Sequence, residues 1–418
     1  MTLAVPGFVP DARSAASSKG VPGIRILSLP VANESTNPDD IEAGAIAVTP
    51  AIIEGLTRQL TADEKSPRPR DVATERIAFR GNYEAVNRFY YRNGWTDGLP
   101  IVPPTEEAVA EMMTGTDLPA DHVVAKVIPR LGKATVEKIA VNAVMAGALP
   151  THMPVLIAAV QAFDDHKTRY DTFQVSTGSW APFLVINGPI RNDIHINFGS
   201  GALSPGNIAN AAIGRAIGLI AKNIGGARKA IEDMGVIGNP SKYSLVIGEN
   251  EEETPWEPLQ VERGFRKEDN TLTVFFPNNF LQNVPSGTDA DALARSLANL
   301  QPISMSALIV IPSHAKILAD AGWTKESLKK FVIENSSRAP ARATQDAVAS
   351  EVLSAPPMAF NTEELMILVA GGPGAWMATL RSVGGIQNSF VSKKIDLPRN
   401  WEELVRRYRN VVPVYAEY

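Results

Sequence analysis

Apolar residues recur along this 418-residue chain in two patterns, as long stretches with helical spacing and as short continuous runs between them. From Ala134 to Gly147, for example, Val136, Ile139 and Ala143 fall on one helical face. Helices are predicted over residues 39–60, 82–93, 106–113, 134–147, 153–163, 207–224, 289–298, 325–335, 375–380 and 401–409. Strands are predicted over residues 24–29, 183–186, 244–247, 272–276, 307–311 and 365–369. Because strands that alternate with helices are typical of βαβ units, the pattern predicts an α/β fold with mostly parallel sheets flanked by helices.

The chain is longer than a typical single core, so several parts are expected. Residues 1–23 are rich in Gly, Pro, Ser and Ala and predict a flexible arm. Residues 24–70 contain one strand, one helix and a charged, proline-containing end, and predict a small βα appendage. The main body is expected to form an α/β domain over residues 75–300 and a second α/β half over residues 301–418. No internal repeat with a fixed period is visible in the sequence.

Composition narrows the classes of function. Hydrophobic residues make up 44% and charged residues 20% of the chain, which is typical of soluble globular proteins. No apolar stretch approaches the roughly 18 residues of a membrane span. The net charge of −5 and the scattered Lys and Arg residues disfavour a nucleic-acid partner. The first residues lack both a basic region and a continuous apolar region, so a cytoplasmic protein is expected.

The sequence contains no cysteine. This excludes a disulfide framework, a thiolate nucleophile, an iron–sulfur cluster and a thiolate zinc site within the chain. Any sulfur or selenium chemistry must therefore come from a partner.

The most distinctive segment is the loop of residues 95–105, with the sequence WTDGLPIVPPT. Its three prolines fix the backbone and its glycine permits a tight turn, so a carboxylate at Asp97 is held in a defined place. Asp97 is a candidate catalytic acid or base, and Trp95 and Thr96 are candidate substrate-binding residues. Thr105 is expected to cap the helix that follows.

An acidic cluster, residues 249–253, follows the predicted strand 244–247 directly. Ligand sites in α/β sheets favour the carboxyl ends of strands. Glu249 and Glu251 would share one side of a continued strand, which suits a divalent cation or a general base. The alternative for the later glutamates is a solvated run of charges. Glu249, nearest the strand, is a candidate catalytic base.

Two glycine-rich turns each precede a predicted helix. Residues 199–207 end at Asn207, with Arg215 about two helical turns further on. Residues 370–374 contain Gly371, Gly372 and Gly374. Either turn could bind an anion through backbone N–H groups, or could simply allow close packing. Neither has the glycine spacing of a dinucleotide-binding fingerprint or of a phosphate-binding loop with Lys-Ser/Thr.

Two further polar residues follow predicted strands. Asn187 ends the strand at residues 183–186 and is a candidate substrate-binding residue. His314 follows the strand at residues 307–311 and is a candidate acid or base. The five histidines show no His-x-x-x-His or His-x-His spacing, so a local histidine metal site is not expected.

Several ordered segments together resemble one bacterial family that is typified by the WTDGLPIVPPT run. The segments are residues 95–105, 142–147, 185–190, 212–216, 223–227, 249–252 and 255–259, and the resemblance covers roughly residues 75–395. Members of this family are found beside proteins with a Sec/Cys-Gly-Ser-Cys motif, the UGSC group. Residues 24–62 are also similar to the tail of a UGSC-type domain.

The resemblance implies a function. The UGSC group resembles the selenoprotein component of glycine reductase, in which a selenol or thiol attacks a carbon atom next to a leaving group. A subunit is therefore expected that binds a small polar organic substrate and helps a UGSC-type partner to cleave or form a carbon–heteroatom bond. Asp97, Glu249 and His314 would act as acids and bases, while Asn187, Asn207 and Arg215 would orient the substrate.

The chain departs from the family pattern at two places. Ala148 stands where relatives have cysteine, and Ala375-Trp376-Met377 replaces a Lys-His-Ser-like segment. Both changes remove reactive groups, which favours a partner thiol or an altered site. The alternatives are a non-catalytic subunit that stabilises this partner, and a metal-dependent hydratase or hydrolase that uses Glu249 and Glu251. A homo-oligomer is also compatible with the sequence.

Overall fold

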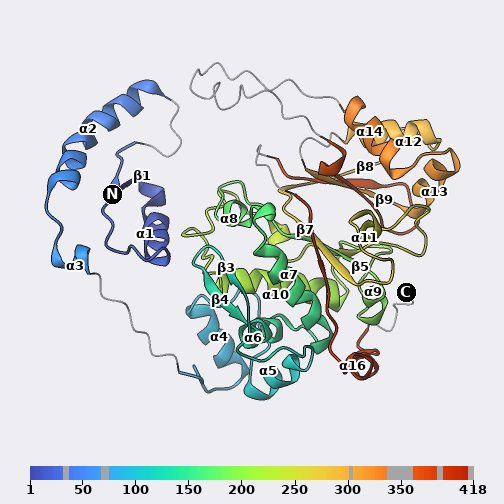
Figure 1. Ribbon diagram of the computed structural model, residues 1–418, viewed down its shortest axis with the longest axis horizontal. Coiled ribbons are helices and arrows are strands. Elements are labelled where there is room, and N and C mark those ends of the chain that lie inside the picture. The colour runs from blue at the N-terminus through green and yellow to red at the C-terminus, as the bar shows by residue number, and fades with distance from the viewer. Residues whose placement is uncertain (32–36, 67–74, 301–304, 337–360, 384–388, 413–418) are drawn as a thin grey trace.

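Two four-stranded sheets form the centre of the main body, which follows residue 75, as the computed structural model shows (Figure 1). The structure describes residues 1–31, 37–66, 75–300, 305–336, 361–383 and 389–412. One sheet has the strand order β12 (Val391–Lys394), β7 (Thr271–Phe275), β5 (Phe183–Asn187) and β6 (Val246–Gly248). The other has the order β10 (Leu365–Val369), β9 (Ser306–Val310), β11 (Met377–Arg381) and β8 (Asn279–Asn283). We call these the first and the second sheet.

The sheets pack face to face, and helices cover both outer faces. The first sheet carries α6 (Val136–Ala146), α7 (Met153–Phe163) and α10 (Ile208–Asn223), and the second carries α12 (Ala290–Asn299), α13 (Pro312–Asp320) and α14 (Lys325–Asn335). In β5, Leu184 packs toward the helices whereas Val185 packs between the sheets. In β9, Ile309 packs between the sheets and Leu308 toward the helices. Because both faces are buried, these strands have the continuous apolar runs that made them visible in the sequence.

The two sheets have the same topology. In the first, β5 pairs in parallel with β6 and antiparallel with β7, and in the second, β9 pairs in parallel with β10 and antiparallel with β11. The fourth strand of each half is exchanged: β8 pairs with β11 of the second sheet, and β12 pairs with β7 of the first. The described chain therefore contains two equivalent β-α-β-β-β halves, which the sequence did not reveal as a repeat.

The expectation of mostly parallel sheets was wrong, because both sheets are mixed. Helices connect β5 to β6 and β9 to β10, and these connections give the parallel pairs. Seven residues separate Val369 of β10 from Met377 of β11, which is too few for a parallel crossover. The helix expected at residues 375–380 is instead strand β11, and β8 and β12 were not anticipated.

The helices of the first half agree closely with the sequence pattern. α5 (Glu106–Met113) and α7 begin and end as predicted, and the hydroxyl of Thr105 caps α5 by accepting the N–H of Ala108 at 3.2 Å. α4 (Tyr83–Arg92) begins after the cap Asn82. The remaining elements here are the hairpin β3 (Val123–Val127) and β4 (Gly132–Thr135), and the short helices α8 (Tyr170–Phe173), α9 (Ile190–Asp193) and α11 (Leu259–Glu262). α16 (Trp401–Tyr408) is the last described helix.

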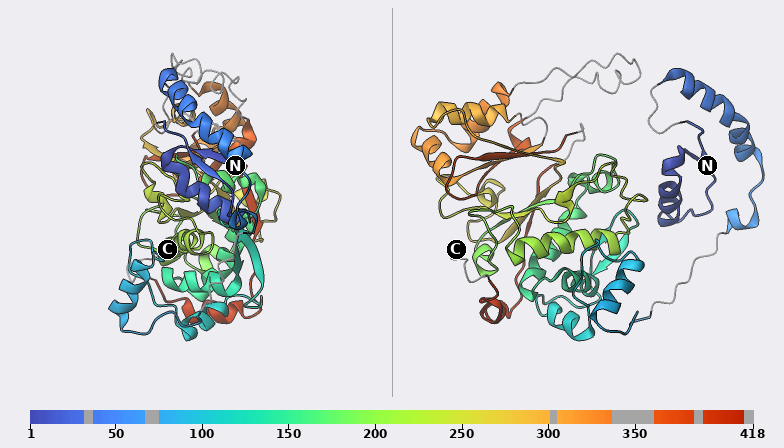
Figure 2. Two further views of the ribbon diagram at one scale, coloured as in Figure 1. Left: turned by 90° about the vertical axis from the view of Figure 1, so that its left-hand side faces the viewer. Right: turned by 180° about the vertical axis from the view of Figure 1, so that it is seen from behind.

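The N-terminal residues form a separate small unit beside the body (Figures 1 and 2). The stretch predicted as an arm contains β1 (Thr2–Ala4) and α1 (Val9–Ser18). β1 pairs in parallel with β2 (Ile26–Ser28), and α2 (Pro38–Thr57) and the single turn α3 (Ala62–Lys65) follow. Arg25 binds the carbonyl oxygens of Arg58 and Gln59 at 3.0 Å and thereby closes the end of α2. No helix in the described ranges is both long enough and apolar enough to cross a bilayer.

Acid is expected to destabilise the fold through His152, which is fully buried before α7. Its Nδ1 accepts the N–H of Leu149 at 3.1 Å, and burial lowers the pKa of the imidazole from 6.5 to about 3. Between pH 6.5 and about 3 the unfolded chain therefore binds one proton more at His152 than the folded chain. The contribution of His152 to the free energy of unfolding is fully present above pH 6.5 and is lost as the pH falls toward 3. The expected slope approaches about 1.4 kcal/mol per pH unit, measured by urea unfolding from pH 7 to 4.

His152→Asn, which keeps an acceptor for Leu149, should flatten this pH dependence. His166→Asn is the matched control, because the side chain of His166 is 90% exposed. A wild-type slope that survives His152→Asn would contradict the assignment.

Candidate functional site

Two strand ends that the sequence had singled out separately lie side by side. β5 and β6 are parallel with Ile186 opposite Gly248, so Asn187 and Glu249 leave the sheet at neighbouring points. Nδ2 of Asn187 donates to Oε2 of Glu249 at 2.8 Å. Gly188 then turns the chain with φ +89°, and a Cβ there would lie 2.9 Å from Cα of Asn270. Glycine is thus required both by conformation and by space.

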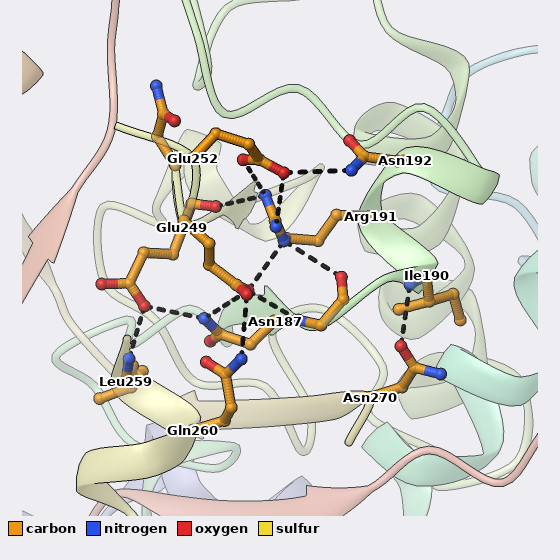
Figure 3. A network of polar contacts seen from close by, with 12 residues as sticks. Asn187, Ile190, Arg191, Asn192, Glu249, Glu252, Leu259, Gln260 and Asn270 are labelled. Carbon is orange, nitrogen blue, oxygen red and sulfur yellow. Dashed lines mark hydrogen bonds and ion pairs between the residues drawn. The ribbon is translucent and has the colours of Figure 1, made fainter. Parts of the chain in front are cut away.

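Arg191 lies at the centre of this polar network (Figure 3). It is 2% exposed and comes from α9, directly after the Gly188 turn. Its guanidinium binds Oε1 of Glu251 at 2.9 Å, the carbonyl of Glu249 at 2.7 Å and both oxygens of Glu252 at 3.1 and 3.2 Å. Burial alone would raise the pKa of Glu252, but its hydrogen bonds to Arg191 and Asn192 outweigh this and lower it. Arg191 is not among the site residues predicted from the sequence, because the segment Ile190-Arg191-Asn192-Asp193 carries no recognisable motif.

Glu251 accepts hydrogen bonds at both carboxylate oxygens. Oε1 receives the N–H of Gly188 at 2.7 Å and Nδ2 of Asn187 at 3.1 Å, in addition to Arg191. Oε2 receives Nε2 of Gln260 at 3.0 Å. The described residues contain no group of three or more His, Asp or Glu side chains that could hold a metal ion. Because the guanidinium of Arg191 already binds Glu251, the geometry favours a structural role for this carboxylate. It organises the loop, and a role as a metal ligand is disfavoured.

Glu249 is a buried, paired anion with no exposed surface. Besides Asn187, its Oε2 accepts the N–H of Leu259 at 2.6 Å, and Oε1 lies 3.3 Å from Nζ of Lys325. Lys325 begins α14, so this ion pair joins the first half to the second. Lys325 also lies 3.6 Å from Glu262, which pairs in turn with Lys329. In this arrangement Glu249 has no free oxygen directed at solvent, and its role as a general base stays a prediction.

The loop of residues 95–105 is fastened to α10. Arg215 binds both oxygens of Asp97, at 2.7 and 3.0 Å, and the carbonyl of Pro100 at 2.7 Å. Two more residues of α10, Lys222 and Asn223, bind the carbonyls of Thr96 and Trp95. The sequence-predicted residues Trp95, Thr96, Asp97 and Arg215 therefore come together, as an ion pair with its surrounding loop. Thr96 is buried, and Trp95 is 38% exposed.

Asp97→Asn is expected to loosen this loop, because it removes the charge from a bidentate ion pair. The free energy of unfolding should fall by about 1–2 kcal/mol, and the Leu99 amide, bound to Asp97 at 3.1 Å, should exchange faster with deuterium. Asp291→Asn, in an exposed pair with Arg295, is the control and should change stability by less than about 0.5 kcal/mol. Unaltered exchange at Leu99 would show that Asp97 does not hold the loop.

The two glycine-rich turns contact each other at the carboxyl end of β10. The N–H of Gly371 donates to the carbonyl of Phe198 at 2.9 Å, and that of Asn250 to Val369 at 2.8 Å. Asn197 holds the first turn through Ser200 O at 3.0 Å and Oδ1 of Asn207 at 3.2 Å. Asn207 thus lies behind the turn and supports it.

Between the turns lies a cleft of about 260 Å³. Its floor is apolar and includes Ile247, Ile309 and Ala370. Ser200, Ser204 and Gln282 supply polar side chains, and Trp376 and Phe280 are 57% and 44% exposed. The complete lining is residues 200–204, 247, 280, 282, 309, 311, 370–374 and 376–378. None of these lining residues has an ionisable side chain.

The cleft depends on close contact between Gly372 and Ser200. A Cβ at Gly372 would lie 2.8 Å from Cβ and 2.9 Å from Cα of Ser200. Gly372→Ala is therefore expected to push the turns apart and to lower the free energy of unfolding by about 1–3 kcal/mol in urea titrations. Gly199→Ala is the control, because its nearest neighbour would be 3.8 Å away. Equal effects of the two substitutions would contradict the contact.

A larger hollow of about 620 Å³ lies beside α14 and is lined by Trp256, Glu262, Lys325 and Lys329, among others. Its two lysines are already paired with Glu249 and Glu262. The wall also includes Glu363 and Phe390, close in sequence to residues 337–360 and 384–388, which lie outside the described ranges. We therefore take the smaller cleft as the candidate site.

The three predicted catalytic residues do not meet. None of the hydrogen bonds or ion pairs of the described residues joins any two of Asp97, Glu249 and His314. His314 is 5% exposed in α13, its Nδ1 has no described partner, and burial lowers the pKa of its imidazole. It lies three residues after Ile311 of the cleft wall but does not itself line the cleft.

Comparison with known proteins adds no relative. No family model matches the chain, and neither the curated proteins nor the solved structures contain a significant match. The resemblance to the WTDGLPIVPPT family therefore stays a prediction.

Proposed function

We propose that the chain binds a small organic molecule in the cleft between residues 200–204 and 370–374, as the ligand-binding part of an enzyme. One observation carries this proposal: two glycine-rich turns, for each of which the sequence left anion binding or close packing open, line the same cleft. The cleft lies at the carboxyl ends of β9 and β10, the usual place for ligands in sheets with parallel pairs. Its apolar floor with a few polar groups is typical of small-molecule sites.

The shape and lining favour a compact ligand. An apolar body would contact Ile247 and Ile309, and the indole of Trp376 would cover it. A carboxylate or other polar group would bind the hydroxyls of Ser200 and Ser204, the amide of Gln282 or the N–H groups of the glycine turns, of which only the first leads into a helix. A volume of about 260 Å³ limits the ligand to a small metabolite.

A partner would supply the reactive group. Of the charged candidates from the sequence, Asp97 and Arg215 pair with each other and Glu249 pairs with Lys325, all outside the cleft, and the chain has no cysteine. This supports the division of labour that the resemblance implies, in which a thiol or selenol of a UGSC-type partner would cleave or form a carbon–heteroatom bond. The stabilising-subunit alternative shares this partner but needs no ligand. The metal-dependent alternative receives no support from the donors around Glu249 and Glu251.

The test is a ligand-observed NMR screen of the full chain against small carboxylates, their amides and their alcohols. Binding of at least one series is expected, with an accompanying change in Trp376 fluorescence. Trp376→Phe should abolish the fluorescence change and retain binding. A screen with no binder, or binders that Trp376→Ala and Gln282→Ala leave unaffected, would refute the proposal.

A further inference from the structure

The N-terminal unit lacks a core of its own. Of its described residues 1–31 and 37–66, only Ser14, Ala16, Gly44 and Val48 are buried. A two-stranded sheet with the helices α1, α2 and α3 and so little buried apolar surface is not expected to be stable alone. Its apolar surface must therefore be covered elsewhere.

Helix α2 has an exposed apolar stripe. Ile46, Ile53 and Leu56 are 66%, 57% and 68% exposed, and their spacing of seven and three residues places them on one side of the helix. Val48, on another side, packs within the unit. A row of large aliphatic side chains on one face is typical of a helix that binds a partner surface.

The charge of α2 limits the choice of partner. The helix contains four carboxylates, Asp39, Asp40, Glu42 and Glu54, and no Lys or Arg. Pairing of α2 with another α2 would bring like charges together. The complementary surface should be apolar and basic.

Such a surface exists on the body of the same chain, around α4. We call the rings of Phe79, Phe89, Tyr90 and Trp95 the aromatic surface. They form a continuous group, with centroids 4.5 Å apart for Phe79 and Phe89, 5.7 Å for Phe89 and Trp95, and 5.4 Å for Tyr90 and Trp95. Phe79 and Trp95 are 40% and 38% exposed, and Tyr91 on α4 is 67% exposed.

The segment that carries the aromatic surface is basic. Residues 75–95 contain four arginines and two glutamates. Arg76 pairs with Glu106, and Arg88 pairs with Glu84. Arg80 and Arg92 form no ion pair among the described residues, so they are available to carboxylates of an incoming helix.

We propose that α2 of one chain packs on the aromatic surface of a second copy of this chain, with reciprocal exchange in a symmetric dimer. The second copy is favoured over the same chain because α1 faces the body, where Ser14 donates to Glu232, and α2 lies on the far side (Figure 2). The exposed stripe thus reaches a neighbour without loss of that contact. Symmetric exchange gives two identical interfaces per dimer.

The experiment is light scattering with size-exclusion chromatography on the full chain, together with analytical ultracentrifugation. The wild type should have twice the mass of one chain. The stripe variant, Ile46→Gln, Ile53→Gln and Leu56→Gln, and the charge variant, Arg80→Glu and Arg92→Glu, should each raise the dissociation constant at least about tenfold. Val236→Gln with Ile237→Gln is the control, because these residues are 74% and 98% exposed elsewhere. All variants change exposed side chains, so circular dichroism should match the wild type.

A mixture of the two variants gives the decisive measurement. A dimer formed from one stripe variant and one charge variant retains one unaltered interface, so the mixture should dimerise more tightly than either variant alone. A monomeric wild type, or a dimer that the charge variant leaves unchanged, would overturn the proposal.

Discussion

Replacing Arg191 by methionine is expected to lower the free energy of unfolding by about 3–5 kcal/mol. The side chain of Arg191 is 3% exposed and supplies the cation beside Glu251, whose side chain is only 7% exposed. Methionine fills much of the space but leaves a carboxylate buried without its cation. It also removes the donor to the carbonyl of Glu249. The measurement is the midpoint and slope of urea unfolding at pH 7.

Arg88→Met is the matched control for this prediction. Arg88 also pairs with a glutamate, Glu84, but both side chains are more than 70% exposed, so a change below about 0.5 kcal/mol is expected. The double variant Arg191→Met with Glu251→Gln should recover part of the loss, because the buried charge is then absent. If the single variant Arg191→Met is as stable as Arg88→Met, the network around Arg191 does not hold the Gly188 turn to the acidic cluster of residues 249–253.

Ser204→Trp should prevent ligand binding in the cleft while the fold remains intact. Ser204 is exposed at the edge of the cleft, and an indole there would occupy much of a volume of about 260 Å³. The dissociation constant of any ligand found in the NMR screen should rise at least about 30-fold, a loss of about 2 kcal/mol in binding free energy. Isothermal titration calorimetry provides the measurement.

The control for this substitution is Ser17→Trp, at an exposed position of α1. It adds the same indole without approaching the cleft and should leave the affinity unchanged. Retained affinity in Ser204→Trp, with unfolding curves equal to those of the wild type, would place the ligand elsewhere.

The sequence predicted helices and strands well where the burial pattern is regular, as in helices with one apolar face and in fully buried strands. α5 and α7 follow from apolar periodicity, and the buried strands β5, β9 and β10 follow from continuous apolar runs. β8 was missed because all five of its residues are exposed, so no apolar run marks it. β11 was taken for a helix because it follows a glycine turn, and six apolar or small residues in succession satisfy either period.

The pairing of the strands was harder to predict from the sequence than the positions of the helices and strands. The sequence alternation of strands and helices predicted parallel pairing, which holds for β5 with β6 and for β9 with β10. β8 and β12 each pair with the sheet of the other half, and this exchange depends on tertiary packing. No local sequence pattern predicts it. The two halves can have the same topology without a visible sequence repeat, because many different apolar residues can fill equivalent buried positions.

The candidate site was predicted in part. Both glycine turns were identified, and so were Asn187 and Glu249 as separate candidates, but their hydrogen bond to each other was not anticipated. What the sequence could not show is which charges pair. Arg191, Gln260 and Lys325 are 58, 9 and 76 residues from the glutamates they bind, and only the fold brings them there. The acidic run that suggested a metal or a base is consequently largely neutralised by the chain itself.

Hydrogen–deuterium exchange of the full chain, with and without the ligand selected by NMR, examines the proposed cleft itself. The account predicts that the ligand protects residues 200–204 and 371–376 together, and leaves residues 256–263 and 324–329 at the larger hollow unchanged. Protection at the larger hollow, or at only one of the two glycine turns, would contradict a shared ligand cleft.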